Sequence, residues 1–156
     1  MLKTILPDEA ATLALGAAIA PAIEPGTVVY LSGELGVGKT TLVRGLLRAL
    51  GFAGRVKSPT YGLLEVYEVS RLHLHHFDFY RFRDPREWID AGFRESFNGL
   101  NASLIEWPER AAGILPPADL EIALALHGTG RSAALTPSSP KGERIVAHAE
   151  QSLRAS

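Results

Sequence analysis

The 156-residue sequence contains no cysteine, which excludes disulfide bonds and thiolate metal sites. An excess of one charge is also missing. Lys and Arg total 16 and Asp and Glu total 17, so the net charge of -1 argues against broad, non-specific nucleic-acid binding. No long apolar run opens the chain, because Pro7, Asp8 and Glu9 interrupt it, and this pattern fits neither a signal peptide nor a membrane span. These absences predict a soluble, cytoplasmic protein.

What the sequence does contain predicts one folded α/β domain. Hydrophobic residues make up 46% and charged residues 21%, the balance of an ordinary globular protein. The length fits a single domain with a substantial core, and we expect the residues after about 137 at its periphery. The segment GTGR and the prolines near 116 indicate loops. The expected helices are 8–20, 40–50, 85–91 and 143–153, and the expected strands are 27–32, 61–69, 72–79, 102–106 and 120–126.

The stretch GELGVGKTT lies between an expected strand and an expected helix, and it matches the Walker A pattern G-x-x-x-x-G-K-[ST]. Its glycines allow positive φ angles, so backbone N–H groups can point at phosphate oxygens, and the following helix adds its positive dipole end. Lys39 is expected to neutralise the β- and γ-phosphates, and the Thr40 hydroxyl to bind Mg²⁺. The context predicts a P-loop NTPase fold with a central, mostly parallel sheet flanked by helices. The expected nucleotide-binding residues here are Gly33, Glu34, Leu35, Gly36, Val37, Gly38, Lys39, Thr40 and Thr41.

Two acidic residues are candidates for the metal side of this site. Glu106 ends the apolar run SLIE, at the strand end where open α/β sheets bind ligands, and it is either a Mg²⁺ ligand or a surface glutamate. Asp78 lies in HHFDFYR, where a two-residue period places it on one face with His76. It either orients water or pairs with a nearby arginine. His73, His75 and His76 form no tetrahedral set on one strand, which favours a structural role over zinc binding.

Thr60 and a basic cluster are the remaining candidates. In SPTY, Pro59 keeps the preceding residue extended, which leaves the Thr60 hydroxyl available to sense the nucleotide; the alternative is a cap at the strand entry. The set Arg81, Arg83 and Arg86 would contact phosphate, RNA or an acidic partner only if a partner is supplied. Otherwise these arginines are solvated surface residues.

Several motifs together give the chain a family resemblance. The segments GELGVGKTTLVRGLL, VKSPTYGLLEVY, HHFDFYRFRDPREW and LIEWPE occur in this order, and the resemblance extends over nearly the whole chain. The chain resembles the TsaE (YjeE) family, small bacterial ATPases of the tRNA threonylcarbamoyladenosine pathway. The family usually has Asp where this chain has Glu34, and Leu where it has Phe79. Both differences are conservative.

The resemblance implies roles for individual residues. Thr40 and Glu106 match the family's Mg²⁺ ligands, and Asp78 and Thr60 match residues of its catalytic or switch surface. Trp107 matches an aromatic residue beside the metal site. Two further positions outside the loop, Thr12 and Arg131, match residues near the nucleotide.

The resemblance also implies partners. TsaE-like proteins hydrolyse ATP slowly and depend on TsaD, which works with TsaB, to support repeated modification of adenosine 37 in tRNAs that read ANN codons. They do not transfer the threonylcarbamoyl group themselves. Contact with tRNA would therefore be indirect, through the complex, and neither a membrane nor DNA is an expected partner.

The expected reaction is in-line attack of water on the γ-phosphate, with Lys39, Mg²⁺ and the loop amides stabilising the developing charge. Either Asp78 or Thr60 would position the water. Two alternatives remain from the residues alone: a small P-loop kinase that transfers the phosphate to a metabolite, and an adaptor that binds ATP without hydrolysing it. A GTPase is disfavoured because the chain has no [NT]-K-x-D motif.

Overall fold

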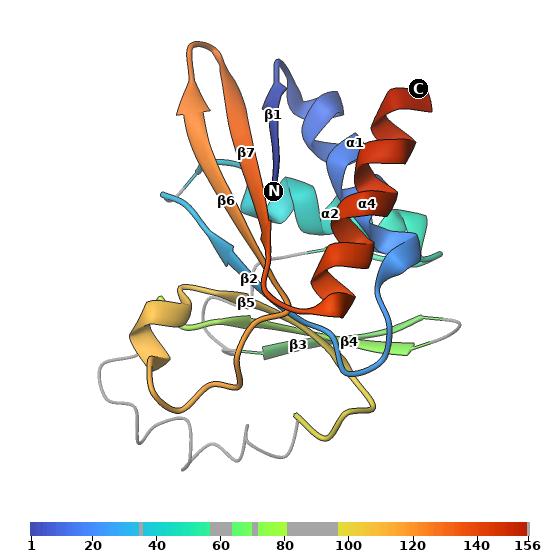
Figure 1. Ribbon diagram of the computed structural model, residues 1–156, viewed down its shortest axis with the longest axis vertical. Coiled ribbons are helices and arrows are strands. Elements are labelled where there is room, and N and C mark those ends of the chain that lie inside the picture. Colours follow the sequence, from blue (N-terminus) through green and yellow to red (C-terminus); the bar gives the residue numbers. More distant parts are fainter. Residues whose placement is uncertain (35, 57–63, 70–71, 81–96, 156) are drawn as a thin grey trace.

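A seven-stranded sheet with helices packed on it forms the α/β fold, seen in a computed structural model that describes residues 1–34, 36–56, 64–69, 72–80 and 97–155 (Figure 1). The strand order is β1-β7-β6-β2-β5-β4-β3. The strands are β1 (Leu2–Leu6), β2 (Val28–Ser32), β3 (Leu64–Val69), β4 (Leu72–Asp78), β5 (Ala102–Glu106), β6 (Leu120–His127) and β7 (Gly130–Pro137). The helices are α1 (Glu9–Ile19), α2 (Lys39–Ala49) and α4 (Pro140–Ala155), with short 3₁₀ turns η1 (Ala20–Ala22) and η3 (Pro108–Ala111).

The centre of the sheet is parallel and its edges are antiparallel. Strand β2 pairs in parallel with β5 and β6, and β5 pairs in parallel with β4. The outer pairs β3·β4, β6·β7 and β1·β7 are antiparallel. The carboxyl ends of β4, β5, β2 and β6 therefore meet at one edge of the sheet, and β2 is the strand whose neighbours on both sides come from later in the chain. This is where open α/β sheets bind their ligands.

The two faces of the sheet are covered differently. Figure 1 shows α1, α2 and α4 gathered on one side, where they share a large apolar core with Val29, Leu31 and Leu104 of the central strands. A smaller cluster around Phe77 and Ile105 lies on the other face, packed against the segment around η3. Because side chains alternate along a strand, β2, β4 and β5 each contribute to both cores.

Helices α1 and α2 approach closely because each has a glycine at their crossing. A Cβ atom on Gly16 would overlap with the carbonyl oxygen of Leu42, and one on Gly45 would overlap with that of Leu13. An ion pair of 3.8 Å between Arg44 Nη1, in the middle of α2, and Glu9 Oε1, at the start of α1, also joins the two helices. Backbone-to-backbone packing thus holds α1 against the helix that carries the glycine-rich sequence at its start.

Most expected elements that fall in the described residues are confirmed, with boundaries shifted by a few residues. Two strands were not expected. The first is β1, and the second is β7, which begins inside the segment GTGR that we expected to be a loop; only Gly128 and Thr129 form the turn. The expected helix 85–91 and the first residues of the expected strand 61–69 lie outside the described residues. No helix in the described part of the chain is long and apolar enough to cross a membrane.

Candidate functional site

The glycine loop, Gly33 to Gly38, connects β2 to α2 at the carboxyl edge of the sheet. Gly33, Gly36 and Gly38 have φ angles of 147°, 78° and 109°, values that residues with a side chain rarely adopt. A Cβ atom on Gly33 would also lie 2.6 Å from the carbonyl oxygen of Leu124 in β6. Gly36 differs, because a Cβ atom there would meet no atom within 4 Å. The loop is therefore packed tightly where it leaves the sheet and open at its tip.

The N-terminus of α2 has free capping positions, unlike the other two described helices. In α1 the Asp8 carboxylate accepts a hydrogen bond of 2.8 Å from the Ala11 amide. In α4 the Ser139 hydroxyl accepts one of 3.2 Å from the Gly142 amide. Helix α2 follows Gly38, which gives no side-chain cap, and it has no acidic residue in its first turn. Its first amides and its positive dipole end are thus available to an anion.

Lys39 is buried at the start of α2, with 6% of its surface exposed. Its Nζ donates a hydrogen bond of 2.7 Å to the carbonyl oxygen of Gly33 and lies 3.6 Å from Oε1 of Glu106. The ammonium group also lies 4.3 Å from the centre of the Trp107 ring, a cation–π contact. The loop, a carboxylate and an aromatic face together hold this charge inside the protein.

Glu106 and Asp78 occupy paired positions at the ends of β5 and β4. Both are buried, with 3% and 6% exposed. The second oxygen of Glu106, Oε2, lies 2.6 Å from Nε2 of His76, which is completely buried. Asp78 Oδ1 accepts a hydrogen bond of 2.9 Å from the amide of Tyr80. The ends of the parallel strands β4 and β5, together with the start of α2, therefore bring a lysine, two carboxylates and a histidine to one edge of the sheet.

Trp107 has an unusual backbone conformation that directs its ring over Lys39. It is the one non-glycine residue of the described chain with a positive φ angle, 56°, and it forms the N-terminal cap position of η3. Its ring also packs against Tyr80, with the ring centres 5.0 Å apart. The left-handed turn after β5 thus places an aromatic wall beside the carboxylate that ends the strand.

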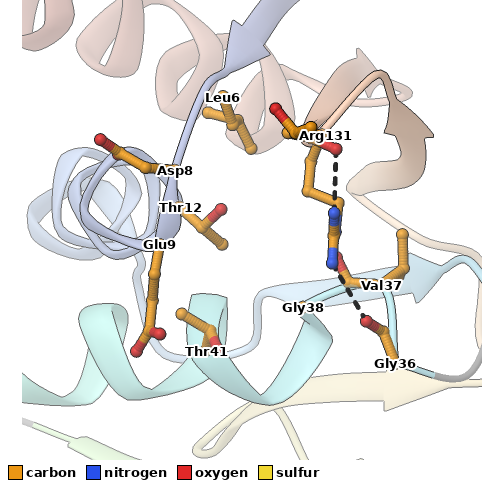
Figure 2. Close-up of a pocket in the computed structure, with 11 residues that line it drawn as sticks. Leu6, Asp8, Glu9, Thr12, Gly36, Val37, Gly38, Thr41 and Arg131 are labelled. Carbon is orange, nitrogen blue, oxygen red and sulfur yellow. Dashed lines mark hydrogen bonds between the residues drawn. The ribbon is translucent and has the colours of Figure 1, made fainter.

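On the other side of the glycine loop lies a pocket of about 190 Å³, shown in Figure 2. Arg131 Nε donates a hydrogen bond of 2.9 Å to the carbonyl oxygen of Val37, and its Nη2 lies 3.5 Å from that of Gly36. Thr12, from α1, is 3% exposed and lines the pocket near Gly38. This side of the loop is held by a guanidinium group bound to backbone carbonyls, and no buried carboxylate takes part in those bonds.

The structure brings most of the expected site residues together around the glycine loop. Lys39, Glu106 and Asp78 lie on one side of it, Thr12 and Arg131 on the other, and Thr40 and Thr41 are half-buried in the first turn of α2. Glu34 is exposed on the loop. The expected residues Leu35, Thr60, Arg81, Arg83 and Arg86 lie outside the described residues.

The residue that sequence reasoning missed is His76 as the partner of Glu106. The two-residue period correctly placed His76 and Asp78 on one face, but the contact also requires β4 and β5 to be neighbours. His75 faces the other way and is half-buried; burial, followed by the nearby His73, lowers its pKa. Within the described ranges, no three His, Asp or Glu side chains are grouped as a metal site would need.

Comparison with known proteins identifies the family of the chain. The family model for "Threonylcarbamoyl adenosine biosynthesis protein TsaE" matches residues 6–133. The chain belongs to the TsaE family. The match begins at the last residue of β1 and extends through the glycine loop and the strand ends to the first half of β7, so every described site residue falls within it.

Relatives of the TsaE family cover most of this chain. The tRNA threonylcarbamoyladenosine biosynthesis protein TsaE of Haemophilus influenzae is 40% identical over 150 residues, which is 93% of this chain and 95% of the relative. The protein of the same name from Bacillus subtilis is 38% identical over 126 residues, covering 81% of this chain and 77% of the relative. A crystal structure of Bacillus subtilis YdiB superposes with a TM-score of 0.82 at 27% identity, covering 96% of this chain and 94% of that one. The family names indicate a role in tRNA threonylcarbamoyladenosine biosynthesis.

Proposed function

We propose that this chain binds ATP with Mg²⁺ and, together with partner proteins, hydrolyses it to support threonylcarbamoylation of adenosine 37 in tRNAs that read ANN codons. The observation that carries the proposal is the buried Lys39–Glu106 pair beside the uncapped start of α2. Burying a charge pair costs free energy because both ions lose their hydration. Here the pair lies beside a helix N-terminus, which is suited to bind an anion. A purely structural loop needs neither feature.

The residues present fit a magnesium–nucleotide complex. The tip of the glycine loop is open at Gly36, and the amides of the first turn of α2 have no side-chain cap. Lys39 would bind the β- and γ-phosphates, and the Thr40 hydroxyl and the Glu106 carboxylate are the hard oxygen ligands that Mg²⁺ prefers. Bound there, Mg²⁺ would neutralise charge on the phosphates. The full proposed ATP-binding set is Gly33, Glu34, Leu35, Gly36, Val37, Gly38, Lys39, Thr40, Thr41, Thr12 and Arg131.

Hydrolysis needs a group that orients water, and Asp78 is the described candidate. Its carboxylate lies beside that of Glu106 in register and is fixed by the amide of Tyr80. A fixed acceptor at a strand end can hold a water molecule for in-line attack. Thr60 is the other candidate, from outside the described residues. Lys39 and the loop amides would stabilise the charge that develops on the phosphoryl oxygens.

We propose TsaD and TsaB as the partners, with tRNA contacted through them. The family resemblance and the pathway named by the relatives support this choice. Hydrolysis is expected to be weak in the isolated chain, because Arg131, the one arginine in the ATP-binding set named above, is bound to carbonyl oxygens of the glycine loop and is not assigned to the transferred phosphate. A partner would then complete the site, and the threonylcarbamoyl transfer itself would take place on the partner.

The test is phosphate release from γ-labelled ATP by the purified chain, alone and with TsaD and TsaB. We expect slow release alone, a clear increase with the partners, and background release by Lys39→Ala in both conditions. Fast release by the isolated chain would contradict the dependence on partners. With a panel of metabolites added to the assay, label found in a metabolite would indicate a kinase. Tight binding without any release in the complete mixture would indicate a non-hydrolysing adaptor.

A further inference from the structure

His76 is the most completely buried polar side chain next to the site, and in the described part of the chain it is, with Lys39, one of two polar side chains that contact Glu106. It lies on β4 in the row Leu72, Leu74, His76, Asp78, which faces the large core. The first two members of this row are apolar and the last two are polar. The row changes from apolar to polar at the end of β4, where Asp78 pairs with Glu106 of β5.

Packing alone does not explain a histidine at this position. A leucine would continue the row, and burying an imidazole costs free energy unless both ring nitrogens find partners. Among the described residues only one nitrogen finds a partner: Nε2 lies 2.6 Å from Glu106 Oε2, while Nδ1 is buried with no hydrogen-bond partner in that part of the chain. The ring is therefore held by a single polar contact, and that contact is to the proposed metal ligand.

The geometry around Glu106 divides its two oxygens between two neighbours. Oε2 faces His76, and Oε1 faces Lys39 at 3.6 Å. Since an ionised carboxylate only accepts hydrogen bonds, Nε2 must carry the proton in this contact. A carboxylate fixed through one oxygen keeps the other in a defined direction, here toward the start of α2. Outer partners of this kind typically change metal affinity by about 10- to 100-fold when they are removed.

We propose that His76 is a positioning residue: its Nε2–H bond to Oε2 holds the Glu106 carboxylate so that Oε1 is presented to the Mg²⁺ of the bound nucleotide. This inference rests on the proposed function. It assigns to His76 no contact with the nucleotide and no transfer of a proton. Its effect is on how strongly Mg²⁺ contributes to nucleotide binding.

Three variants of the full chain test the proposal, with isothermal titration of ADP in excess Mg²⁺ and in EDTA. His76→Gln can place an amide N–H near the position of Nε2. His76→Asn has a similar polarity, but its amide ends near the position of Nδ1 and cannot reach Glu106. His76→Leu removes the donor and keeps the volume. Thermal melting of each variant establishes that it is folded. If His76→Leu does not fold, the comparison of His76→Gln with His76→Asn still tests the proposal.

We expect the gain in affinity that Mg²⁺ gives the wild type to fall by about 10- to 100-fold in the Asn and Leu variants and to stay within a few-fold in the Gln variant. Affinity in EDTA should be unchanged in all three. Wild-type dependence on Mg²⁺ in the Asn and Leu variants would overturn the inference, as would an equal loss with and without Mg²⁺, which a purely structural role predicts. If the wild type itself binds no nucleotide, the proposed function fails instead.

Discussion

The two sides of the glycine loop solve different physical problems. On the pocket side, defined by Thr12 and Arg131, a partly exposed guanidinium binds the loop's own carbonyl oxygens. On the acid side, defined by His76, Asp78 and Glu106, the polar side chains are buried; Glu106 contacts both His76 and Lys39, and Asp78 accepts a hydrogen bond from the Tyr80 amide. The first arrangement fixes the shape of the loop, while the second concentrates charge. Substitutions on the pocket side should therefore alter nucleotide affinity whether or not Mg²⁺ is present, and those on the acid side should alter the reaction and the contribution of Mg²⁺ to binding.

The largest effect is expected from Lys39→Ala, which removes the charge shared by the loop and the acid side. Phosphate release in the presence of the partners should fall by about 10²- to 10³-fold, the usual loss when one transition-state stabiliser is removed. The measurement is the rate at saturating ATP. Lys3→Ala is the matched control, because Lys3 is exposed on β1. A rate within a few-fold of wild type would contradict the role given to Lys39.

Glu106→Gln should follow, with a loss of about 10²-fold in the rate and a smaller loss in stability. The amide keeps the shape but leaves the Lys39 ammonium without its buried counter-charge, which typically costs about 1–3 kcal/mol of unfolding free energy. Rates measured over a range of Mg²⁺ concentrations, together with urea denaturation, separate the two effects. The exposed Glu109 offers the control Glu109→Gln. If Glu106→Gln and Glu109→Gln have the same effect on the rate and on its Mg²⁺ dependence, Glu106 is not a Mg²⁺ ligand.

Arg131→Ala tests the pocket side, and it should have a moderate effect on ATP affinity instead of on the rate. Losing the hydrogen bonds to Val37 and Gly36 should weaken ATP binding by about tenfold, equivalent to about 1.4 kcal/mol, while the rate at saturation changes by only a few-fold. Titration of ATP gives the affinity. Arg154→Ala, on the exposed end of α4, is the control. A large loss in the saturated rate with normal affinity would break the distinction between the two sides.

The smallest effect concerns His75, the neighbour of His76 on the opposite face of β4. Because burial and then His73 lower its pKa, the folded protein binds this proton less readily than the unfolded chain does. Its contribution to stability is therefore present above the unfolded value near 6.5 and is lost as the pH falls toward the lower, folded value. In His75→Gln the unfolding free energy should decline less between pH 7 and pH 5 than in wild type. The exposed His127→Gln should leave that slope unchanged.

Local patterns in the sequence predicted the parts of the fold that local physics determines. The glycine loop, its flanking strand and helix, and the alternating faces of HHFDFYR follow from backbone preferences and from the two-residue period. Three site residues, Lys39, Asp78 and Glu106, were found in this way. The ends of parallel strands meet at one edge, so the last two were expected near the loop once an α/β order was recognised.

The remaining parts depend on contacts between distant segments. Strand β1 pairs with β7, which begins more than a hundred residues later, and Leu6 lies opposite Arg131. Strand β7 is rich in alanine and contains Gly130, both weak signals for a strand. The contact of His76 with Glu106 has the same origin, because it needs the order of β4 and β5 in the sheet. A sequence period can assign a face to a residue, but it cannot name the neighbouring strand.

The glycine crossing of α1 and α2 has a mechanical consequence. Helix α1 carries Thr12 of the pocket, and α2 begins at the glycine loop. Two parts of the site therefore belong to helices whose backbones are in direct contact. Sliding between them would drive Gly16 and Gly45 into carbonyl oxygens. The two helices should therefore move as one rigid body. A partner that displaces the exposed side of α1 should displace the glycine loop with it.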